Sequence, residues 1–420
     1  MNNSTRERRP DSGSGSEEGP VATVLERSPL LRSNAERYAD SKPFAGFLIG
    51  VSAPLTPHTG LFVDVLAAGG ATVLVTSEEG TTQTEVVTWL KDRPGVTPLA
   101  RAGMSADELT ETRREILSKE PDLIADDGAF LLSMLHEEFP EVATGVCGGC
   151  EQTTGGISKL KPIDREDALT VPVYDVNGTP MKRHFDNVHG TAESSLSAVL
   201  SLTNTMISGS VAVVVGYGYC GRGVARKLRA LGARTIVTEV DPRKALEALA
   251  DGHDVRPLRE AVPEADLLLT ATGRYRVFRD EHIEQLTDGT IVASIGSEIE
   301  IDEQSLAERA THIERQKPGV DQYLLPNGRR VTLLTGGRVV NLAAPDSTGN
   351  PSEVMDTTFS LMVRALEALA DGVDLEPGLH PLPDRLDREV AHEKLAAMDV
   401  EIDEVSPDQH AYHEWENERY

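Results

Sequence analysis

Two short polar stretches near the middle of the chain contain side chains that can move protons. Asp126 and Asp127 are adjacent and are followed by Gly128, whereas Lys182 and Asp186 are four residues apart. Adjacent carboxylates at a crevice, or a Lys and an Asp on one helix face, can act in general acid–base catalysis. The alternatives are structural: a helix N-cap with a solvated neighbour for the Asp pair, and an exposed ion pair for Lys182 and Asp186.

A Gly-rich turn follows the apolar run at residues 211–215. Gly216, Gly218 and Gly221 form the pattern G-x-G-x-x-G, in which the first Gly allows a tight turn, the second lets the backbone approach a pyrophosphate, and the third permits close helix–strand packing. Glu239 closes the next predicted strand, where a carboxylate accepts a hydrogen bond from a ribose 2′-hydroxyl and disfavours a 2′-phosphate. We therefore expect a Rossmann domain that binds NAD rather than NADP; the alternative is a Gly-rich turn without a ligand.

A third polar stretch, residues 148–156 (GGCEQTTGG), lies between these features. A Gly- and Thr-rich loop can present backbone N–H groups and hydroxyls to a polar ligand. We therefore expect Gln152, Thr153 and Thr154 at the same crevice as Asp127.

Cys147 and Cys150 form a C-x-x-C pattern. A redox pair requires a helix that begins at its first Cys, and a structural zinc ion requires four ligands. Neither context is visible, so the sequence predicts no metal site and leaves the role of these thiols open.

The polar stretches lie at the ends of short apolar runs that alternate with helical patterns. In the first part of the chain, strands are predicted at residues 47–51, 72–76 and 123–125, and helices at 61–66 and 106–117. In the second part, strands are predicted at 211–215, 235–238, 267–270 and 290–293, helices at 222–231 and 242–250, and a hairpin that pairs 323–325 with 331–334. This order is typical of parallel, doubly wound sheets, whose ligands bind beyond the carboxyl ends of the strands.

The predicted fold class is α/β, with two doubly wound parallel-sheet domains and a short C-terminal helical tail. A long apolar helix that includes Phe359 and Leu369 returns the chain to the first domain; its apolar face is expected either in a subunit contact or in an intrachain core. The expected division is a disordered segment at 1–20, a substrate-binding domain at 21–188 and 350–375, an NAD-binding domain at 189–349, and a tail at 376–420.

Charge and composition exclude several classes of protein. Among 420 residues, 41 are Lys or Arg and 68 are Asp or Glu, which gives a net charge of −27. Nucleic-acid affinity comes mainly from Lys and Arg, so no nucleic-acid partner is expected. Ten Lys and a large acidic excess favour a surface adapted to high salt. With no apolar run long enough for a bilayer, no signal peptide and three Cys, we expect a soluble cytoplasmic protein without a membrane partner.

In their order along the chain, these motifs resemble the S-adenosylhomocysteine hydrolase family, and the resemblance covers nearly all of the chain after Val21. The matching stretches are residues 126–128, 151–156, 176–187, 190, 193–194, 216–218, 238–239, 272–273, 320–321, 327–330, 337–338, 340–342, 382–383, 386–387, 389–391 and 400–403.

The resemblance implies a bound NAD that oxidises the ribose 3′-hydroxyl of a nucleoside thioether. The C4′ proton then becomes acidic, homocysteine is eliminated, water adds at C5′, and the ketone is reduced again. By position, Lys182 with Asp186 would handle the 3′-hydroxyl and Asp127 would be the C4′ base. The resemblance also implies a homo-oligomer, either a dimer or a tetramer.

Further roles are carried over from the family by position. Asn177 and Asn187 would position the ribose and the nicotinamide, with Asn187 beside the catalytic pair, and Thr56, His58 and Gln152 would contact the substrate. The residues expected to hold NAD are Thr153, Thr154, Gly155, Gly216, Gly218, Gly221, Glu239 and Asn341.

The chain departs from the family pattern at four places. Gln152 replaces a family Glu, Asn350 replaces a family His, and residues 296–298 (Gly-Ser-Glu, with Ser297) stand one residue short where the family has Gly-His-Phe. Residues 54–60 (PLTPHTG) lack another family His and introduce His58. Two alternatives therefore remain beside the family activity: the same redox chemistry on a different base or 5′-substituent, and a non-catalytic NAD-binding paralogue.

Overall fold

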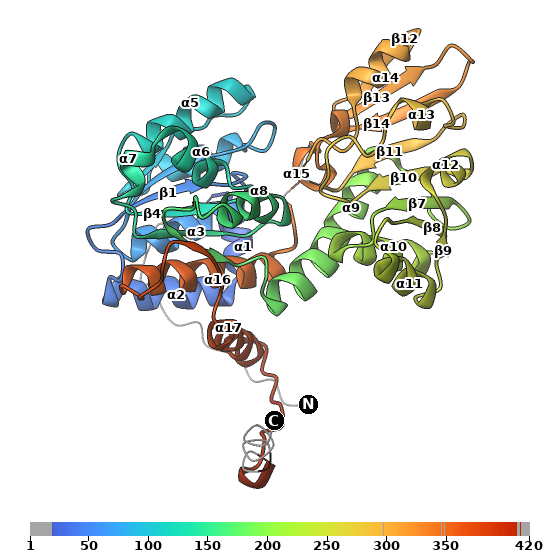
Figure 1. The fold of residues 1–420 in the computed structure, drawn as a ribbon. Coiled ribbons are helices and arrows are strands. Elements are labelled where there is room, and N and C mark those ends of the chain that lie inside the picture. The colour runs from blue at the N-terminus through green and yellow to red at the C-terminus, as the bar shows by residue number, and fades with distance from the viewer. Residues whose placement is uncertain (1–18, 297, 346, 348, 410–411, 413–420) are drawn as a thin grey trace, which may run out of the picture.

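The computed structural model describes residues 19–296, 298–345, 347, 349–409 and 412, so most of the segment predicted as disordered lies outside the described residues, as does Ser297. Figure 1 shows two lobes side by side, each built on a twisted sheet with helices on both faces. The predicted α/β class with two doubly wound domains is confirmed, because both sheets are wholly or mainly parallel.

The first lobe contains a seven-stranded parallel sheet in the order β15-β6-β5-β4-β1-β2-β3. Residues 378–381, which the sequence analysis placed in the tail, form its edge strand and pair with β6. The strands are β1 (Leu48–Ser52), β2 (Thr72–Thr76), β3 (Val96–Pro98), β4 (Leu123–Asp126), β5 (Gly148–Glu151), β6 (Pro172–Asp175) and β15 (Gly378–Pro381).

Helices cover both faces of this sheet (Figure 1). They are α1 (Ala22–Leu25), α2 (Pro29–Ser41), α3 (Pro57–Ala68), α4 (Thr84–Lys91), α5 (Ala106–Leu117), α6 (Phe130–Glu138), α7 (Pro140–Ala143), α8 (Thr154–Arg165), α16 (Ser352–Ala370) and α17 (Asp384–Ala397). The prediction of a loop at residues 148–156 was wrong. Its first four residues form the buried strand β5, and α8 begins three residues later, because the glycines lie where the sheet and a helix approach closely.

The second lobe contains an eight-stranded sheet in the order β12-β13-β14-β11-β10-β7-β8-β9. The predicted hairpin is confirmed, because β13 and β14 are antiparallel and Leu324 pairs with Arg330. The strands are β7 (Val211–Val215), β8 (Arg234–Thr238), β9 (Asp254–Val255), β10 (Leu267–Thr270), β11 (Ile291–Ser294), β12 (His312–Lys317), β13 (Val320–Leu324) and β14 (Arg330–Leu334). The helices are α10 (Tyr219–Ala230), α11 (Pro242–Ala250), α12 (Leu258–Ala261), α13 (Asp280–Ile283), α14 (Glu303–Arg309) and α15 (Val340–Ala343), with short 3₁₀ turns η2 (Val262–Glu264) and η3 (Thr335–Gly337).

The chain passes between the lobes twice. The first passage is the π-helix η1 (Lys182–Gly190), which continues into α9 (Thr191–Thr203), and the second leads into α16. Helix α16 belongs to the core of the first lobe, where Phe359 stacks on Phe62 with ring centroids 4.8 Å apart. Of the two expectations for this apolar helix, the intrachain core is therefore confirmed.

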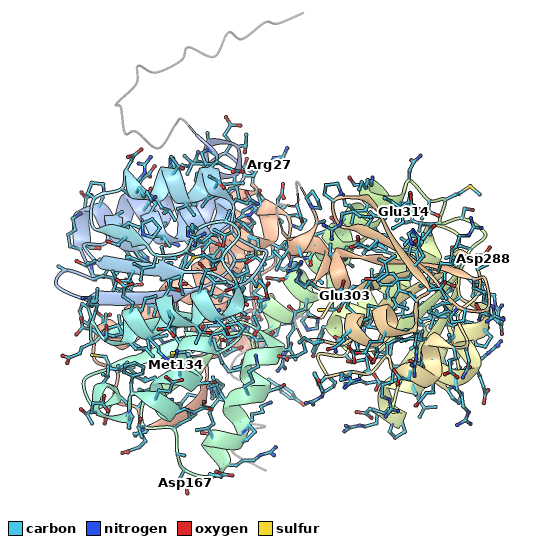
Figure 2. All side chains as sticks on the ribbon, turned by 90° about the horizontal axis from the view of Figure 1, so that it is seen from above. Arg27, Met134, Asp167, Asp288, Glu303 and Glu314 are labelled. Carbon is cyan, nitrogen blue, oxygen red and sulfur yellow. The ribbon has the colours of Figure 1, made fainter. Side chains whose placement is uncertain are left out.

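Acidic side chains are spread over the surface of both lobes. Asp167, Asp288, Glu303 and Glu314, labelled in Figure 2, are all exposed, and they lie on different elements. The dispersed carboxylates match a surface that is kept soluble by charge rather than one acidic binding face. Among the described residues, no helix has both the length and the apolar character needed to cross a membrane.

The buried carboxylate of Asp356 ties three helices together. It lies in α16 and accepts hydrogen bonds from the backbone N–H groups of Leu30 and Leu31 at the start of α2, at 3.3 and 2.9 Å. It also pairs with Lys394 of α17 at 2.8 Å. A buried charge is stabilising only when it is fully paired, so loss of this carboxylate would leave buried partners on α2 and α17 without their acceptor.

Replacing Asp356 by Ala should lower the free energy of unfolding by about 3 kcal/mol, because two backbone donors and a largely buried ammonium lose their acceptor. Chemical denaturation at constant salt measures the change. Asp384→Ala is the control, since it removes an exposed i,i+4 partner of Arg388 in α17 and should cost less than about 0.5 kcal/mol. Similar losses of stability in both variants would contradict the role of Asp356 in joining α2, α16 and α17.

Candidate active site

A cavity of about 1300 Å³ lies between the lobes, and it collects almost every side chain that the sequence selected. It is bounded by the carboxyl ends of strands from both sheets, as expected for doubly wound folds. The selected residues that line it are Thr56, His58, Asp127, Gln152, Thr153, Thr154, Gly155, Asn177, Lys182, Asp186, Asn187, Gly216, Gly218, Glu239 and Asn341. Gly221 does not line the cavity.

Lys182 and Asp186 form a buried ion pair at the cavity wall. The Lys182 Nζ atom lies 2.8 Å from Asp186 Oδ2, and the residues are only 6% and 3% exposed. The alternative of an exposed surface pair is therefore wrong. The pair lies on η1, and π-helical segments are rare and often occur at functional sites.

The Asp186 carboxylate is also held by residues from the second passage between the lobes. Asn350 Nδ2 donates to Asp186 Oδ1 at 2.6 Å, and Thr358 Oγ1 of α16 donates to Oδ2 at 2.7 Å. The side-chain oxygen Oδ1 of Asn350 in turn accepts from Asn341 Nδ2 at 2.9 Å and from Ser194 Oγ at 2.7 Å. Asn350 therefore connects Asp186 directly to a residue expected to hold the cofactor.

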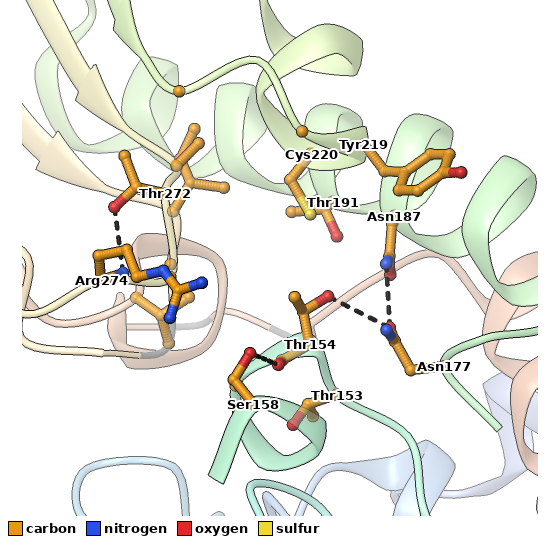
Figure 3. A pocket seen from close by; sticks show the side chains of 18 of the residues that line it. Thr153, Thr154, Ser158, Asn177, Asn187, Thr191, Tyr219, Cys220, Thr272 and Arg274 are labelled. Atoms are coloured by element: carbon orange, nitrogen blue, oxygen red, sulfur yellow. Dashed lines mark hydrogen bonds between the residues drawn. The ribbon is translucent and has the colours of Figure 1, made fainter. Parts of the chain in front are cut away.

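A second chain of amides runs from Lys182 towards α8. Lys182 Nζ donates to Asn187 Oδ1 at 3.0 Å, and Asn187 Nδ2 donates to Asn177 Oδ1 at 3.1 Å. Thr154 Oγ1 approaches the same Asn177 oxygen at 3.4 Å, as Figure 3 shows. These contacts fix the two amide side chains and connect Lys182 to the first residue of α8.

The two adjacent aspartates have different environments. Asp126 accepts from the backbone N–H of Leu132 at 2.9 Å in the first turn of α6, but the N-cap residue of that helix is Ala129, so the alternative of an N-cap role for the Asp pair is wrong. Asp127 faces the cavity and accepts from Gln152 Nε2 at 2.7 Å. Burial raises the pKa of Asp127 to about 7, while Lys182 and Gln152 act in the opposite direction. A carboxylate with a pKa near neutrality is suited to general base catalysis.

Glu151 holds the turns around the two aspartates in place. Its buried carboxylate accepts from the backbone N–H groups of Gly128 and Ala129 at 3.1 and 2.7 Å. It also accepts from the N–H and the hydroxyl of Thr153, both at 2.6 Å. Thr153 thereby serves as the N-cap of α8, since its Oγ1 accepts from Gly156 N. A side chain at Gly156 would collide with Glu151.

The Gly-rich turn after β7 has the geometry that a dinucleotide requires. Gly216 has a φ of +100°, a conformation that favours Gly, and a Cβ at Gly221 would collide with the carbonyl oxygen of Gly216. A Cβ at Gly218 would meet no atom within 4 Å, so this backbone faces open space. The three positions therefore match the three roles expected for turn, close approach and packing.

Two further groups fit the same ligand. Glu239, at the end of β8, accepts from the backbone N–H groups of Tyr217, Val240 and Asp241 at 2.7 to 3.0 Å, which fixes its carboxylate at the cavity wall. Among the described residues, no donor reaches the buried Oδ1 atom of Asn341. A buried acceptor without a partner is costly, and a ligand donor would satisfy it.

Comparisons with known proteins agree with this geometry. The family model described as "S-adenosyl-L-homocysteine hydrolase, NAD binding domain" matches residues 187–347. An S-inosyl-L-homocysteine hydrolase of Methanopyrus kandleri is 41% identical over 93% of both chains. An adenosylhomocysteinase of Haloquadratum walsbyi is 40% identical over 93% of this chain and 91% of its own. An adenosylhomocysteinase of Thermotoga maritima is 41% identical over 91% and 95%.

The chain belongs to the S-adenosylhomocysteine hydrolase family. The resemblance stated from the motifs is confirmed, as are its enzymatic class and NAD as its cofactor. The roles of individual residues are not tested by these similarities, so they stay predictions.

His58, the histidine that this chain introduces into the family pattern, lines the cavity from the first lobe. His58, in the first turn of α3, is 2% exposed, and its Nε2 atom lies 2.9 Å from Ser352 Oγ. Thr56 precedes the same helix, and its hydroxyl lies 3.3 Å from that of Thr59. Both residues belong to the first lobe, whereas the Gly216–Gly221 turn belongs to the second.

Several residues of the site had escaped the sequence analysis. Thr358 lies within an apolar helix pattern, and nothing local marks its contact with Asp186. Glu300 is fully buried and accepts from the backbone N–H groups of Thr272 and Gly273 at 2.7 to 3.0 Å. Glu78 lines the cavity near Asp127. An isolated acid in a polar loop carries no distinguishing pattern, so Glu78 could be found only from the fold.

Cys147 and Cys150 are free thiols, the first exposed and the second buried in β5.

The Gly218→Ala substitution should separate cofactor binding from folding. Its methyl group enters open space in the apo protein, so the melting temperature of the NAD-free protein should stay within about 1 °C. It should, however, lower NAD affinity at least about tenfold, because it blocks close approach of the pyrophosphate. Fluorescence titration with NAD and thermal unfolding measure the two effects.

Gly145→Ala provides the matched control, because a Cβ there meets only the Val142 carbonyl oxygen, at 3.6 Å, outside the cavity. It should change neither quantity. Unaltered NAD affinity in Gly218→Ala would show that the turn does not hold the pyrophosphate.

Proposed function

We propose that this family member hydrolyses a purine-nucleoside 5′-thioether of homocysteine by reversible oxidation at C3′. The observation that carries the proposal is a single cavity that joins the Gly-rich turn to the Lys182–Asp186 pair and Asp127. Bound NAD supplies the hydride acceptor for the ribose C3′ carbon. We further propose the domain division expected from the sequence, except that residues 378–397 join the substrate-binding domain. We also propose a cytoplasmic location and a homo-oligomer, and analytical ultracentrifugation would distinguish a dimer from a tetramer.

The Lys182–Asp186 pair takes up the proton of the 3′-hydroxyl during oxidation and returns it during reduction. Burial and the 2.8 Å contact hold the pair ready for this exchange, and the Asn350 and Thr358 donors orient the carboxylate. Preorganised groups of this kind need little rearrangement as the proton moves.

Asp127 removes the C4′ proton once C3′ is a ketone. Gln152 positions it through its Nε2 atom, and the amide oxygen Oε1 of Gln152 is buried and, within the described structure, has no donor. That oxygen is suited to accept from a ribose hydroxyl. Gln152 thus contacts both the substrate ribose and the catalytic carboxylate of Asp127, at the position where the family pattern has a Glu.

His58 favours a 6-oxopurine as the base. Adenine presents an amino group that donates, whereas hypoxanthine presents an oxygen that accepts at the same position. A histidine ring can donate a hydrogen bond to that oxygen, and the Ser352 hydroxyl can serve either tautomer of His58. A carboxylate at position 58, as in a His58→Glu variant, could only accept. The relative from Methanopyrus kandleri and one from Methanothermobacter thermautotrophicus are both named S-inosyl-L-homocysteine hydrolases. We therefore propose S-inosyl-L-homocysteine as the preferred substrate and S-adenosylhomocysteine as the second.

Substrate addition tests this proposal. With S-inosyl-L-homocysteine the purified holoenzyme should show the absorbance of NADH and release homocysteine, with kcat/KM at least about tenfold above that for S-adenosylhomocysteine. His58→Glu should reverse the preference. Lys182→Ala is the control: it should keep NAD bound but lose about 10² or more of the reduction rate. NADH without homocysteine would indicate altered 5′ chemistry, and no NADH with either nucleoside would favour a non-catalytic paralogue.

The pH dependence of C4′ exchange tests Asp127 and Gln152. Asp127 is active when ionised, so exchange of the substrate C4′ hydrogen should be present above the raised pKa of about 7 and lost as pH falls through it. Gln152→Glu removes the hydrogen-bond donor to Asp127 and adds a negative charge beside it, which should raise the pKa of Asp127. The pH below which C4′ exchange is lost should therefore rise by about one unit. Exchange in deuterated buffer, followed by NMR, measures both profiles. A limb that stays in place would contradict the assignment of Asp127.

A further inference from the structure

Glu78 is a cavity carboxyl to which the mechanism so far gives no role. It follows β2 by two residues and lies at the same sheet edge as Asp127, because β2 and β4 flank β1 in parallel. Both side chains line the cavity, together with Pro54 and Gln152. Glu78 thus lies on the first lobe's side of the substrate space, opposite the Gly-rich turn of the second lobe.

The two cations near the Glu78 carboxyl, Arg113 and Lys159, contact other groups. Among the described residues, none donates a hydrogen bond to it or forms an ion pair with it. Arg113 donates to the Ser77 carbonyl oxygen at 2.9 Å and lies over the Phe130 ring. Lys159 pairs with Glu298 at 3.2 Å. Both cations are therefore engaged elsewhere.

The local charges favour the protonated form of Glu78. Burial is the largest cause that raises its pKa, to about 8, and Asp127 and then Asp126 act in the same direction. Arg113 and Lys159 oppose them. A carboxyl that is protonated near neutrality can donate a proton and later accept one, whereas Asp127 beside it is poised to act as a base.

We propose that Glu78 is the general acid that protonates the leaving sulfur, and the general base that activates the water added at C5′. The proposal rests on the proposed function, which requires elimination of a thiolate. At the described positions where the family pattern has histidines, this chain has Pro54, which cannot transfer a proton, and Asn350, which is occupied with Asp186. On the first lobe's wall of the cavity, His58 contacts Ser352, whereas Glu78 lies on the Asp127 side.

The steps balance in protons and electrons. Asp127 takes the C4′ proton, the electron pair forms the C4′–C5′ double bond, and the C5′–S bond breaks as the Glu78 proton passes to sulfur. Homocysteine leaves as a neutral thiol, and Glu78 is then a carboxylate. In the second half, Glu78 takes a proton from water, the hydroxide oxygen bonds to C5′, and Asp127 returns its proton to C4′.

The test varies the leaving group in a Glu78→Gln holoenzyme. With the homocysteine thioether, NADH should still form, but thiol release should fall by about 10² or more. With a 5′-(4-nitrophenylthio) nucleoside of the same base, whose thiolate needs no proton, the loss should be less than about tenfold. Glu79→Gln is the control, because Glu79 is exposed and its carboxylate pairs with Arg338; it should lose less than about threefold on both substrates.

Equal losses on the two substrates, or no loss on either, would overturn the role of Glu78. If Glu78→Gln does not fold, Glu78→Ala assayed with added formate replaces it, and failure of formate to restore thiol release would overturn the role as well. Absence of NADH in the unsubstituted enzyme would instead overturn the proposed function, so the two failures are distinguishable.

Discussion

The site depends on one constraint, that the buried charge of Asp186 must be fully satisfied. A carboxylate that is 3% exposed is stable only if cations and donors surround it, and here they come from two regions far apart in sequence. Lys182 comes from the same π-helix, Thr358 from α16 and Asn350 from the second passage between the lobes. The requirement to pair one charge therefore fixes the cofactor side and the substrate side of the cavity relative to each other.

The carboxyl groups at the edge of the first sheet divide into two kinds. Asp126 and Glu151 accept several backbone N–H groups, and they hold the turns from which the site is built. Asp127 and Glu78 face the cavity, where burial raises the pKa of both. Backbone donors stabilise an ionised carboxylate, and their absence leaves a carboxyl free to change its protonation state. A carboxyl group at this sheet edge is thus structural where backbone N–H groups donate to it, and reactive where they do not.

The sequence predicted the adjacent strands β1, β2 and β4 of the first sheet and most strands of the second, because strands buried on both faces are apolar runs between helices, and the hairpin because its turn is marked by Asn327 and Gly328. It missed β3, β5, β6 and β15 of the first sheet and β9 and β12 of the second. It failed where glycines serve close packing rather than a loop, as at residues 148–156, since packing against Glu151 becomes visible only in the fold. The Lys182–Asp186 spacing was compatible with a surface pair or a buried one, and long-range burial decided between them. Thr358 and Glu78 have no local signature, because their roles arise from contacts with distant segments.

The replaced family histidines change which groups can carry protons. Asn350 occupies its position with an amide that bonds to Asp186 but does not titrate, so it orients the redox pair at any pH. Pro54 removes a side-chain proton carrier from the opposite wall. A reaction that moves protons to sulfur and from water still requires groups that titrate near neutrality. In this cavity burial supplies them, because it shifts carboxyl groups into the range in which histidine ordinarily acts. The loss of histidines is therefore compatible with the family chemistry when the surrounding carboxyls are desolvated.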